Sequence, residues 1–315
     1  MNSNFVSRAE STRNHSRTGQ ESTRPASPAL TTGGGILHAV ALIAPAIATA
    51  AAQTPSTVAE TAKEEPPNAS DPTRFFQTHF FPHEPFYFIA GVESPNAKFQ
   101  ISFKYQLFTG AGWLAEHIHP LTNFYLGYSQ TSLWDWSTPS APFFDSSYRP
   151  ELLYWMPQID QGKWADWFRL DLQGGVQHES NGRDEEDSRS LNIAYIKPRV
   201  VFGNPDGFQL ALAPRAWVYV GDIVDNPDIK DYRGYFDLRA VIGWQKHAQL
   251  SATGRIGDDF DHGSLQLDLT YPLWKVPIVR SSLFFHVQYF IGYGESLLLY
   301  DKRGSSIRAG FALFR

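Results

Sequence analysis

Hydrophobic and polar residues alternate with a period of two along most of the chain from residue 85 onward. In residues 98–107, KFQISFKYQL, apolar and aromatic residues occupy the odd positions, and lysine, glutamine and serine the even ones. Residues 232–244 and 263–273 repeat this alternation. Such a pattern, sustained over about ten residues, predicts β-strands with one apolar and one polar face. These strands are longer than the five or six residues common in soluble sheets.

Twelve segments of this kind are separated by turn-forming sequences such as NPDG at 204 and DKRG at 301. We expect them to begin near residues 85, 98, 123, 149, 167, 189, 208, 232, 248, 262, 281 and 305. An even number of long strands with aromatic residues at their ends is typical of outer-membrane barrels. A large soluble β-sandwich is the alternative, but unbroken apolar faces on every strand suit lipid better. The pattern predicts an all-β fold, a twelve-stranded antiparallel transmembrane β-barrel.

The polar face of these strands is rich in charge of both signs. Its charged residues are Lys98, Lys104, Arg169, Asp171, Lys197, Arg199, Arg233, Asp237, Arg239 and Asp268. Opposite charges can pair across a lumen that is narrower than that of porins with 16 to 18 strands. We therefore expect a polar, plugged interior and no general diffusion pore.

The first part of the chain does not follow the alternating pattern. An apolar run at residues 33–53 follows several arginines and ends in small residues, which predicts a signal peptide over residues 1–52. A single membrane anchor is the alternative. Residues 53–82 are mostly rich in proline, alanine and glutamate, which predicts a flexible linker. The barrel domain is then expected over residues 83–315.

Composition narrows the chemistry only slightly. The 315-residue chain has no cysteine, so neither disulfides nor thiol catalysis is available. Its formal net charge is -5, and it has no dense basic stripe, which argues against a nucleic-acid partner.

One strand changes character at its end. In residues 167–180, WFRLDLQGGVQHES, the even positions are apolar or glycine up to Val176 and then hold His178 and Ser180. If the apolar parity faces lipid, these two side chains project from the outer wall of the barrel. Asn192 has the lipid-facing parity of the next strand, and a hairpin would bring it beside His178.

A hydroxyl, an imidazole and an orienting third group form the arrangement used in acyl transfer. His178 would accept the proton of Ser180, and Asn192 would hold the imidazole. On spacing alone, an interfacial histidine and a turn serine are the more common explanation. Polar groups that face hydrocarbon are costly, which favours the catalytic interpretation.

Five stretches resemble the outer membrane phospholipase A family of Gram-negative bacteria, in the order in which that family has them. They are YSQTSLWD at 128–135, SAPFFDSSYRPEL at 140–152, HESNGRDEEDSRSLNIAY at 178–195, DNPDI at 225–229 and GYGESLLLYD at 292–301. The resemblance implies a twelve-stranded barrel that hydrolyses the sn-1 and sn-2 acyl esters of phospholipids and lysophospholipids. It also implies Ser180 as nucleophile, His178 as general base and Asn192 as the residue that orients His178.

The resemblance further implies calcium dependence and activity as a homodimer in the outer membrane, with acyl chains bound along the subunit interface. The matching positions for calcium are Ser140 from one subunit, Arg183 and Ser188 from the other, and Asp225 as a secondary ligand. Glu185 stands where the family can have aspartate, and Gln130 matches a polar residue of the dimer interface. Calcium and the Ser180 amide would stabilise the oxyanion.

The chain departs from the family pattern near these positions. Leu191 and Ile193 replace a tryptophan and an arginine, and Ala141, Phe144 and Asp145 replace a serine, an arginine and a glutamate. The triad residues are all kept, and the changes bear on calcium affinity. Two other functions stay open: a non-catalytic barrel, either a narrow channel or a structural protein, and an esterase acting on other lipids.

Overall fold

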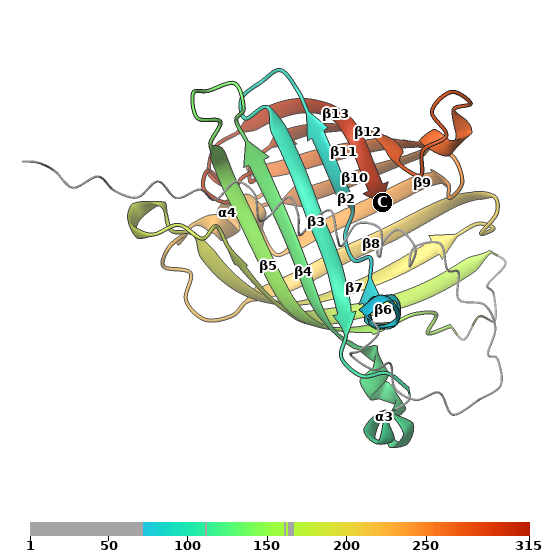
Figure 1. Ribbon diagram of the computed structural model, residues 1–315. Coiled ribbons are helices and arrows are strands. Elements are labelled where there is room, and N and C mark those ends of the chain that lie inside the picture. The colour runs from blue at the N-terminus through green and yellow to red at the C-terminus, as the bar shows by residue number, and fades with distance from the viewer. Residues whose placement is uncertain (1–71, 111, 161, 163–166) are drawn as a thin grey trace, which may run out of the picture. The chain divides into compact units, whose positions relative to one another are not determined.

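The computed structural model describes residues 72–110, 112–160, 162 and 167–315, which form a closed antiparallel β-barrel (Figure 1). Each strand pairs with its neighbours in sequence, and the pairing of β13 with β2 closes the ring. The twelve barrel strands are β2 (Phe86–Ala90), β3 (Ala97–Gln106), β4 (Phe124–Trp134), β5 (Phe143–Met156), β6 (Phe168–Ser180), β7 (Ser190–Phe202), β8 (Phe208–Tyr219), β9 (Phe236–Trp244), β10 (Gln249–Ile256), β11 (Gly263–Pro272), β12 (Phe284–Gly292) and β13 (Gly304–Phe314). The predicted twelve-stranded barrel is confirmed.

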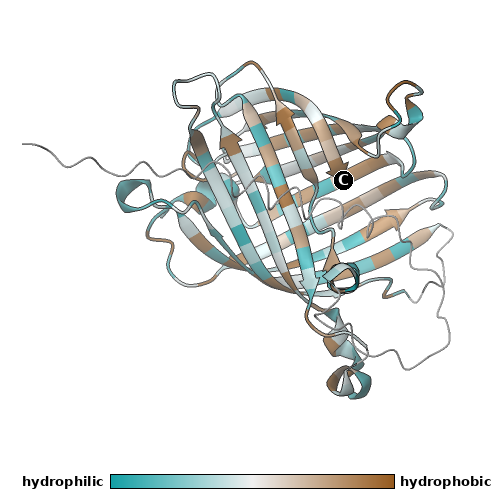
Figure 2. Cartoon of the chain, viewed as in Figure 1, coloured by the Kyte–Doolittle hydropathy of each residue, from teal (hydrophilic) through white to brown (hydrophobic). Residues whose placement is uncertain are grey.

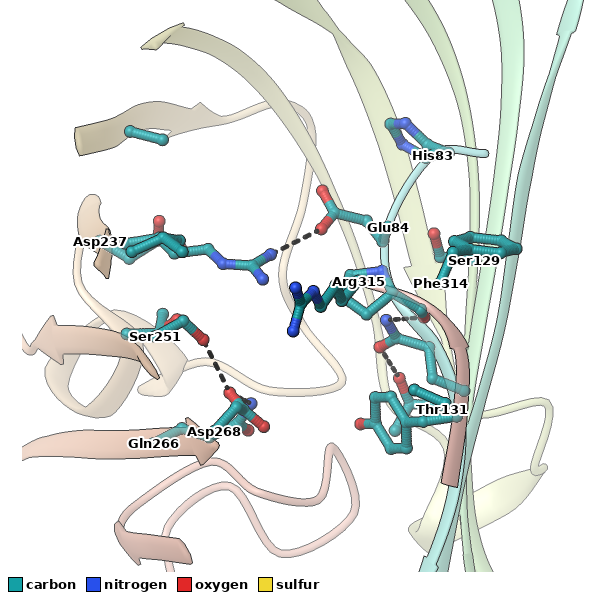
Figure 3. Close-up of a pocket in the computed structure, with 18 of the residues that line it drawn as sticks. His83, Glu84, Ser129, Thr131, Asp237, Ser251, Gln266, Asp268, Phe314 and Arg315 are labelled. Carbon is teal, nitrogen blue, oxygen red and sulfur yellow. Dashed lines mark hydrogen bonds and ion pairs between the residues drawn. The ribbon is translucent and has the colours of Figure 1, made fainter. Parts of the chain in front are cut away.

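The first barrel strand is interrupted. A two-residue strand, β1 (Phe80–Phe81), and β2 both pair with β3, and the four residues between them leave the sheet. This interruption brings His83 and Glu84 to the lumen (Figure 3). Prolines at both ends of the interruption, Pro82 and Pro85, lack the amide donors that a sheet ladder needs.

Two strand starts lie four or more residues from the expected positions. Strand β5 begins at Phe143, six residues before the expected 149, because a polar run at its start hides the alternation. Strand β9 begins at Phe236 because Ile229–Arg233 forms helix α4, which ends at Gly234 with a φ of 58°. Arg233, expected on a strand, therefore lies at the end of a helix, although its side chain still lines the lumen.

Short helices lie outside the barrel strands. Besides α4 they are α2 (Pro72–His79), α3 (Trp113–His117) and the 3-10 helices η1 (His119–Asn123), η2 (Glu185–Asp187) and η3 (Leu273–Lys275). No helix within the described residues is long and apolar enough to cross a membrane.

The predicted signal peptide, residues 1–52, lies outside the described residues, as does the predicted linker up to residue 71. The last part of that linker holds α2 and β1, because aromatic rings fix it to the barrel. Phe75 and Phe80 lie with ring centroids 6.1 and 5.3 Å from that of Tyr105 on β3.

The outer wall is apolar. Hydrophobic and polar residues alternate along the strands (Figure 2), and many large apolar side chains on the outside are exposed, including Leu126, Val176, Ile196 and Phe311. Aromatic pairs lie at both ends of the strands, such as Phe208–Trp244 and Trp134–Phe143. Apolar walls bordered by aromatic residues match the environment of a lipid bilayer.

The lumen is polar, as expected, and it contains partly buried ion pairs. Lys197 Nζ lies 2.8 Å from Glu84 Oε1, and Arg215 Nη2 lies 2.6 Å from Asp237 Oδ2. Asp268 accepts hydrogen bonds from several neighbours on adjoining strands (Figure 3). A cavity of about 1010 Å³ remains among these groups.

An apolar cluster fills the lumen at the end where β6 finishes and β7 begins. Its buried members come from β7, β8, α4 and the β12–β13 connection, and they are Leu191, Ile193, Tyr195, Trp217, Ile229, Leu297 and Tyr300. In the same connection Glu295 pairs with Lys98 and Arg308. Burial acts to raise the pKa of Glu295, but these two cations outweigh it and hold the pKa below its usual range.

Candidate active site

Strands β6 and β7 form a hairpin that places the polar outward residues beside one another. In its register His178 lies opposite Asn192, and Ser180 lies opposite Ser190. His178 and Asn192 are exposed on the outer wall, whereas Glu179, of opposite parity, is buried in the lumen. Because side chains alternate along a strand, the fold brings the predicted serine, histidine and asparagine to one lipid-facing patch.

The closest contact in this patch joins the imidazole to the amide. His178 Nδ1 lies 2.9 Å from Asn192 Oδ1. An amide oxygen can only accept, so this contact assigns the proton to Nδ1 and leaves Nε2 with a free lone pair. The imidazole is thus held with its basic nitrogen available to a neighbouring hydroxyl.

Ser180 is held by the turn that follows it. Its Oγ accepts a hydrogen bond from the Gly182 amide at 3.1 Å. Across the described residues, no hydrogen bond joins Ser180 Oγ to His178. The two side chains share a face two residues apart, and catalytic hydrogen bonds are often long before substrate binds.

A residue that the sequence did not single out organises the loop between β6 and β7. The Asn181 side chain is buried, and its Oδ1 accepts from the amides of Arg183 and Arg189 at 3.3 and 3.0 Å. Its Nδ2 donates to the carbonyl of Asp187 at 2.8 Å. The sequence signal was available, since asparagine commonly bonds to nearby backbone in turns.

The predicted calcium ligands lie close to this loop, and two of them meet. Ser188 Oγ donates to Asp225 Oδ2 at 3.2 Å, and Ser190 Oγ donates to the same atom at 3.1 Å. The Arg183 guanidinium pairs with Asp187 at 3.1 Å and also donates to the Phe144 carbonyl.

The remaining calcium candidates are loop residues with unusual backbone. Ser140 is exposed in the β4–β5 connection with a φ of 70°, and within the described chain it forms no hydrogen bond to Ser188 or Asp225. Glu185 begins η2 with a φ of 51°, and its carbonyl accepts from the Ser188 amide at 3.1 Å. The structure therefore gathers Ser188 and Asp225 but leaves Ser140 on a separate loop.

The donors available here suit a hard cation. They are hydroxyl, carboxylate and backbone carbonyl oxygens, which are the ligands that calcium prefers. In the described part of the chain, the Arg183 carbonyl accepts no hydrogen bond, which leaves it available as a ligand. No group of three His, Cys, Asp or Glu side chains that could hold a metal occurs among the described residues. A calcium site would therefore combine few carboxylates with hydroxyl and backbone oxygens.

Gln130 faces outward on β4, in line with Ser180. The register aligns Gln130 with Tyr148 on β5, and Tyr148 with Ser180 on β6. Gln130 accepts from Tyr128 at 2.9 Å and donates to Ser132 at 3.1 Å. These hydrogen bonds fix an amide in a largely apolar wall.

The residues that depart from the family pattern have interior or backbone roles. Leu191 and Ile193 belong to the apolar cluster in the lumen, where neither reaches the outer patch. Phe144 offers its carbonyl to Arg183, as noted above. The buried Asp145 accepts from Ser296 Oγ at 2.6 Å and from the Leu298 amide at 2.9 Å, which fastens the β12–β13 connection to β5.

Comparison with known proteins agrees with the fold. A family model described as Phospholipase A1 matches residues 74–313. Phospholipase A1 of Escherichia coli strain K12 is 32% identical over 221 residues, which are 69% of each chain. Phospholipase A1 of Klebsiella pneumoniae is 34% identical over 223 residues, 69% of this chain and 70% of that protein.

Solved structures give the same result. Outer membrane phospholipase A from Escherichia coli has a TM-score of 0.60 and 27% identity, covering 74% of this chain and 94% of that one. The Salmonella typhi outer membrane phospholipase dimer with bound calcium has a TM-score of 0.60 and 26% identity, covering 74% and 92%. The chain therefore belongs to the phospholipase A1 family and is an outer-membrane phospholipase built as a twelve-stranded β-barrel.

Proposed function

We propose that the protein is a calcium-dependent serine hydrolase that cleaves acyl esters of phospholipids and lysophospholipids from the outer wall of its barrel. In this proposal Ser180 is the nucleophile, His178 the general base and Asn192 the residue that orients His178. The observation that carries it is the 2.9 Å contact between His178 Nδ1 and Asn192 Oδ1 on the lipid-facing side of the β6–β7 hairpin.

The chemistry follows from these atoms. His178 Nε2 takes the proton of Ser180 Oγ as Oγ attacks the ester carbonyl carbon, and the imidazolium then gives that proton to the departing alcohol. Water repeats the sequence on the acyl-Ser180 ester, with His178 again as base, and fatty acid leaves. Asn192 keeps the ring in the required tautomer throughout, although an amide stabilises the imidazolium less than a carboxylate does.

The developing oxyanion needs donors close to Ser180. The Gly182 amide, 3.1 Å from Oγ, points into this region, and the Ser180 amide is the second donor in the proposal. Calcium, when bound, supplies positive charge at this point. The Arg183 carbonyl, Ser188 and Asp225 would hold it, together with Ser140 of a second copy of the chain.

A second copy is part of the proposal because Ser140 lies on a loop apart from Ser188 and Asp225. The Salmonella typhi relative is a dimer with bound calcium, which supports the same arrangement here. The outward row through Gln130 and Tyr148 beside Ser180 is the face that we assign to the dimer. Phospholipid acyl chains would lie along this face.

Covalent trapping tests the proposal directly. The refolded barrel, in mixed micelles with calcium, should release fatty acid from phospholipid and lose this activity when treated with a sulfonyl fluoride. Peptide mass spectrometry should find one sulfonyl group, on Ser180. Modification at another serine, or fatty-acid release that survives full modification of Ser180, would exclude Ser180 as the nucleophile.

The same preparation tests the non-catalytic alternative. A barrel that releases no fatty acid under dimer-promoting conditions, but conducts ions in a planar bilayer, would be a channel that kept the motif. The ion pairs in the lumen argue against free conduction.

Substitutions at Asn192 separate ring orientation from the other parts of the mechanism. Asn192→Ala is expected to lower kcat by about 10- to 100-fold, because the imidazole loses the acceptor that selects its tautomer. Asn192→Asp should stay closer to the parent, because a carboxylate accepts the same Nδ1–H bond. Initial rates of fatty-acid release measure both. If Asp proved as damaging as Ala, the orienting role of Asn192 would be wrong.

A further inference from the structure

One segment inside the barrel contacts both catalytic strands from behind. Residues 225–233, which include helix α4, follow β8 and fold into the lumen. Ile229 is fully buried in the apolar cluster together with Leu191 and Ile193 of β7. These two residues flank Asn192 in sequence and have the opposite parity. The inner surface of the active-site patch is therefore covered by this segment.

One end of the segment is bonded to the start of β7. Asn226 has no exposed surface, and its Oδ1 accepts the amide N–H of Ser190 at 3.0 Å. Ser190 lies opposite Ser180 in the hairpin and two residues before Asn192. The backbone of Asn226 is itself fixed, since its amide donates to the carbonyl of Ile223 and its carbonyl accepts from the Ile229 amide.

The other end is bonded to β6. Arg233 Nη1 donates to Glu179 Oε2 at 3.0 Å, and Nη2 donates to Oε1 at 3.4 Å. Both side chains are almost fully buried, at 12% and 6% exposure. Glu179 lies between His178 and Ser180 in the strand, so this two-pronged ion pair holds the backbone that carries the base and the nucleophile.

The segment is also hydrogen-bonded to parts of the barrel other than β6 and β7. Tyr300, from the β12–β13 connection, donates its hydroxyl to Asp228 just before α4. Tyr219 on β8 donates to the Gly234 carbonyl at 3.0 Å. The segment is therefore a fixed body, not a loose loop that happens to touch the hairpin.

The outward patch has few hydrogen bonds or ion pairs that would fix its side chains. His178 and Asn192 are exposed, and lipid gives them no fixed polar partners. Their relative position depends on the register and separation of two strands whose inner faces the segment holds. A displacement of about 1 Å in a reacting group can cost about 10²-fold in rate.

We propose that residues 225–233 are an internal brace that sets the catalytic geometry through the barrel wall, with Asn226 and Arg233 as its positioning residues. The brace never touches substrate. It acts on His178 and Ser180 through Glu179, and on Asn192 through the Ser190 amide. This inference rests on the proposed Ser180 mechanism and adds to it residues on the opposite side of the sheet.

The test compares two lumen arginines with different partners: Arg233 pairs with Glu179 on β6, and Arg215 pairs with Asp237 on β9. Arg233→Met and Asn226→Ala should each lower kcat by about 10- to 100-fold, with KM within about two-fold of the parent. The kcat of Arg233→Lys should lie between those of the parent and Arg233→Met. Lysine keeps the positive charge but lacks the two parallel guanidinium donors. The matched control is Arg215→Met, which removes a buried ion pair joining β8 to β9.

The readout is restricted to folded protein. Heat-modifiable migration on gels counts the folded fraction, and the rate at which a sulfonyl fluoride labels Ser180 in that fraction reports its reactivity without lipid. Slower labelling in Arg233→Met than in Arg215→Met, with an unchanged shape of the pH–rate profile, is the expected result. Glu179→Met combined with Arg233→Met should slow labelling by less than the product of the two single effects, because the two residues share one ion pair, while Glu179 also accepts from Ser147 Oγ at 2.7 Å.

Two results would overturn the brace. In one, Arg233→Met and Asn226→Ala keep the parental kcat and labelling rate while Ser180→Ala is inactive, which would leave the proposed function standing. In the other, Arg215→Met loses as much reactivity as Arg233→Met at equal folded fraction. If Ser180→Ala itself stayed active, the proposed function would fail first, and the same assay separates the two cases.

Discussion

Ser180→Ala is expected to lower kcat for phospholipid hydrolysis by about 10⁴-fold or more, with little change in lipid binding. The nucleophile of a serine hydrolase has no substitute, and removing it alone abolishes nearly the whole contribution of the triad. In the part of the chain that the structure describes, the one hydrogen bond of Ser180 Oγ is the one that it accepts from the Gly182 amide. Loss of the hydroxyl should therefore leave the fold intact. Initial rates of fatty-acid release under saturating lipid give the comparison.

A serine elsewhere in the wall controls for the loss of a hydroxyl. Ser264→Ala on β11, far from the hairpin in the sheet order, should keep the parental rate. Both variants should show the same heat-modifiable migration as the parent. More than about a tenth of parental activity in Ser180→Ala would mean that another group carries the reaction, because no triad enzyme tolerates that loss so well.

Removal of calcium is the second large effect expected. A chelator should lower kcat by about 10²- to 10³-fold, the loss typical of removing an oxyanion-stabilising group, and added calcium should restore it. Asp225→Asn should raise the calcium concentration needed for half-maximal activity by about ten-fold, because it weakens one charged oxygen ligand. Asp206→Asn is the control, since Asp206 pairs with Lys246 in an exposed turn.

The calcium prediction also bears on assembly. If Ser140 of a second copy completes the site, calcium should increase the cross-linked dimer in parallel with activity. Full activity in the presence of chelator would keep Ser180 as nucleophile and exclude a metal from the oxyanion site. Activity that depends on calcium without any dimer would place all of its ligands on one chain.

The strands were predictable because each had to satisfy lipid on one side and a polar lumen on the other. That demand fixes the parity of nearly every residue, which is why the outward position of His178, Ser180 and Asn192 could be inferred before any coordinates. The alternation is harder to detect where the outer wall is polar. The run Asp145 to Ser147 at the start of β5 hides its alternation, because Asp145 serves the β12–β13 connection.

The interior of the site was less accessible from sequence. Residues 232 and 233 follow the alternation of the next strand. Only a three-dimensional partner, Glu179 on β6, shows that Arg233 belongs to a helix end that reaches the hairpin. The role of Asn226 could not be predicted for the same reason, since it depends on the hydrogen bond that its side chain accepts from the Ser190 amide. Interactions between segments far apart in the chain leave no local periodicity to detect.

The outward placement of the patch has a consequence for how such an enzyme is controlled. A pocket enzyme samples substrate from dilute solution, and its rate responds to concentration. A site on the barrel wall lies in a medium made of phospholipid, so wherever that lipid fills the surrounding leaflet the enzyme is permanently near saturation. Tighter or weaker lipid binding would then change its turnover little. In the proposed mechanism, restraint has to come from whether the catalytic groups are complete and aligned, so assembly of the dimer would be the step that controls the reaction.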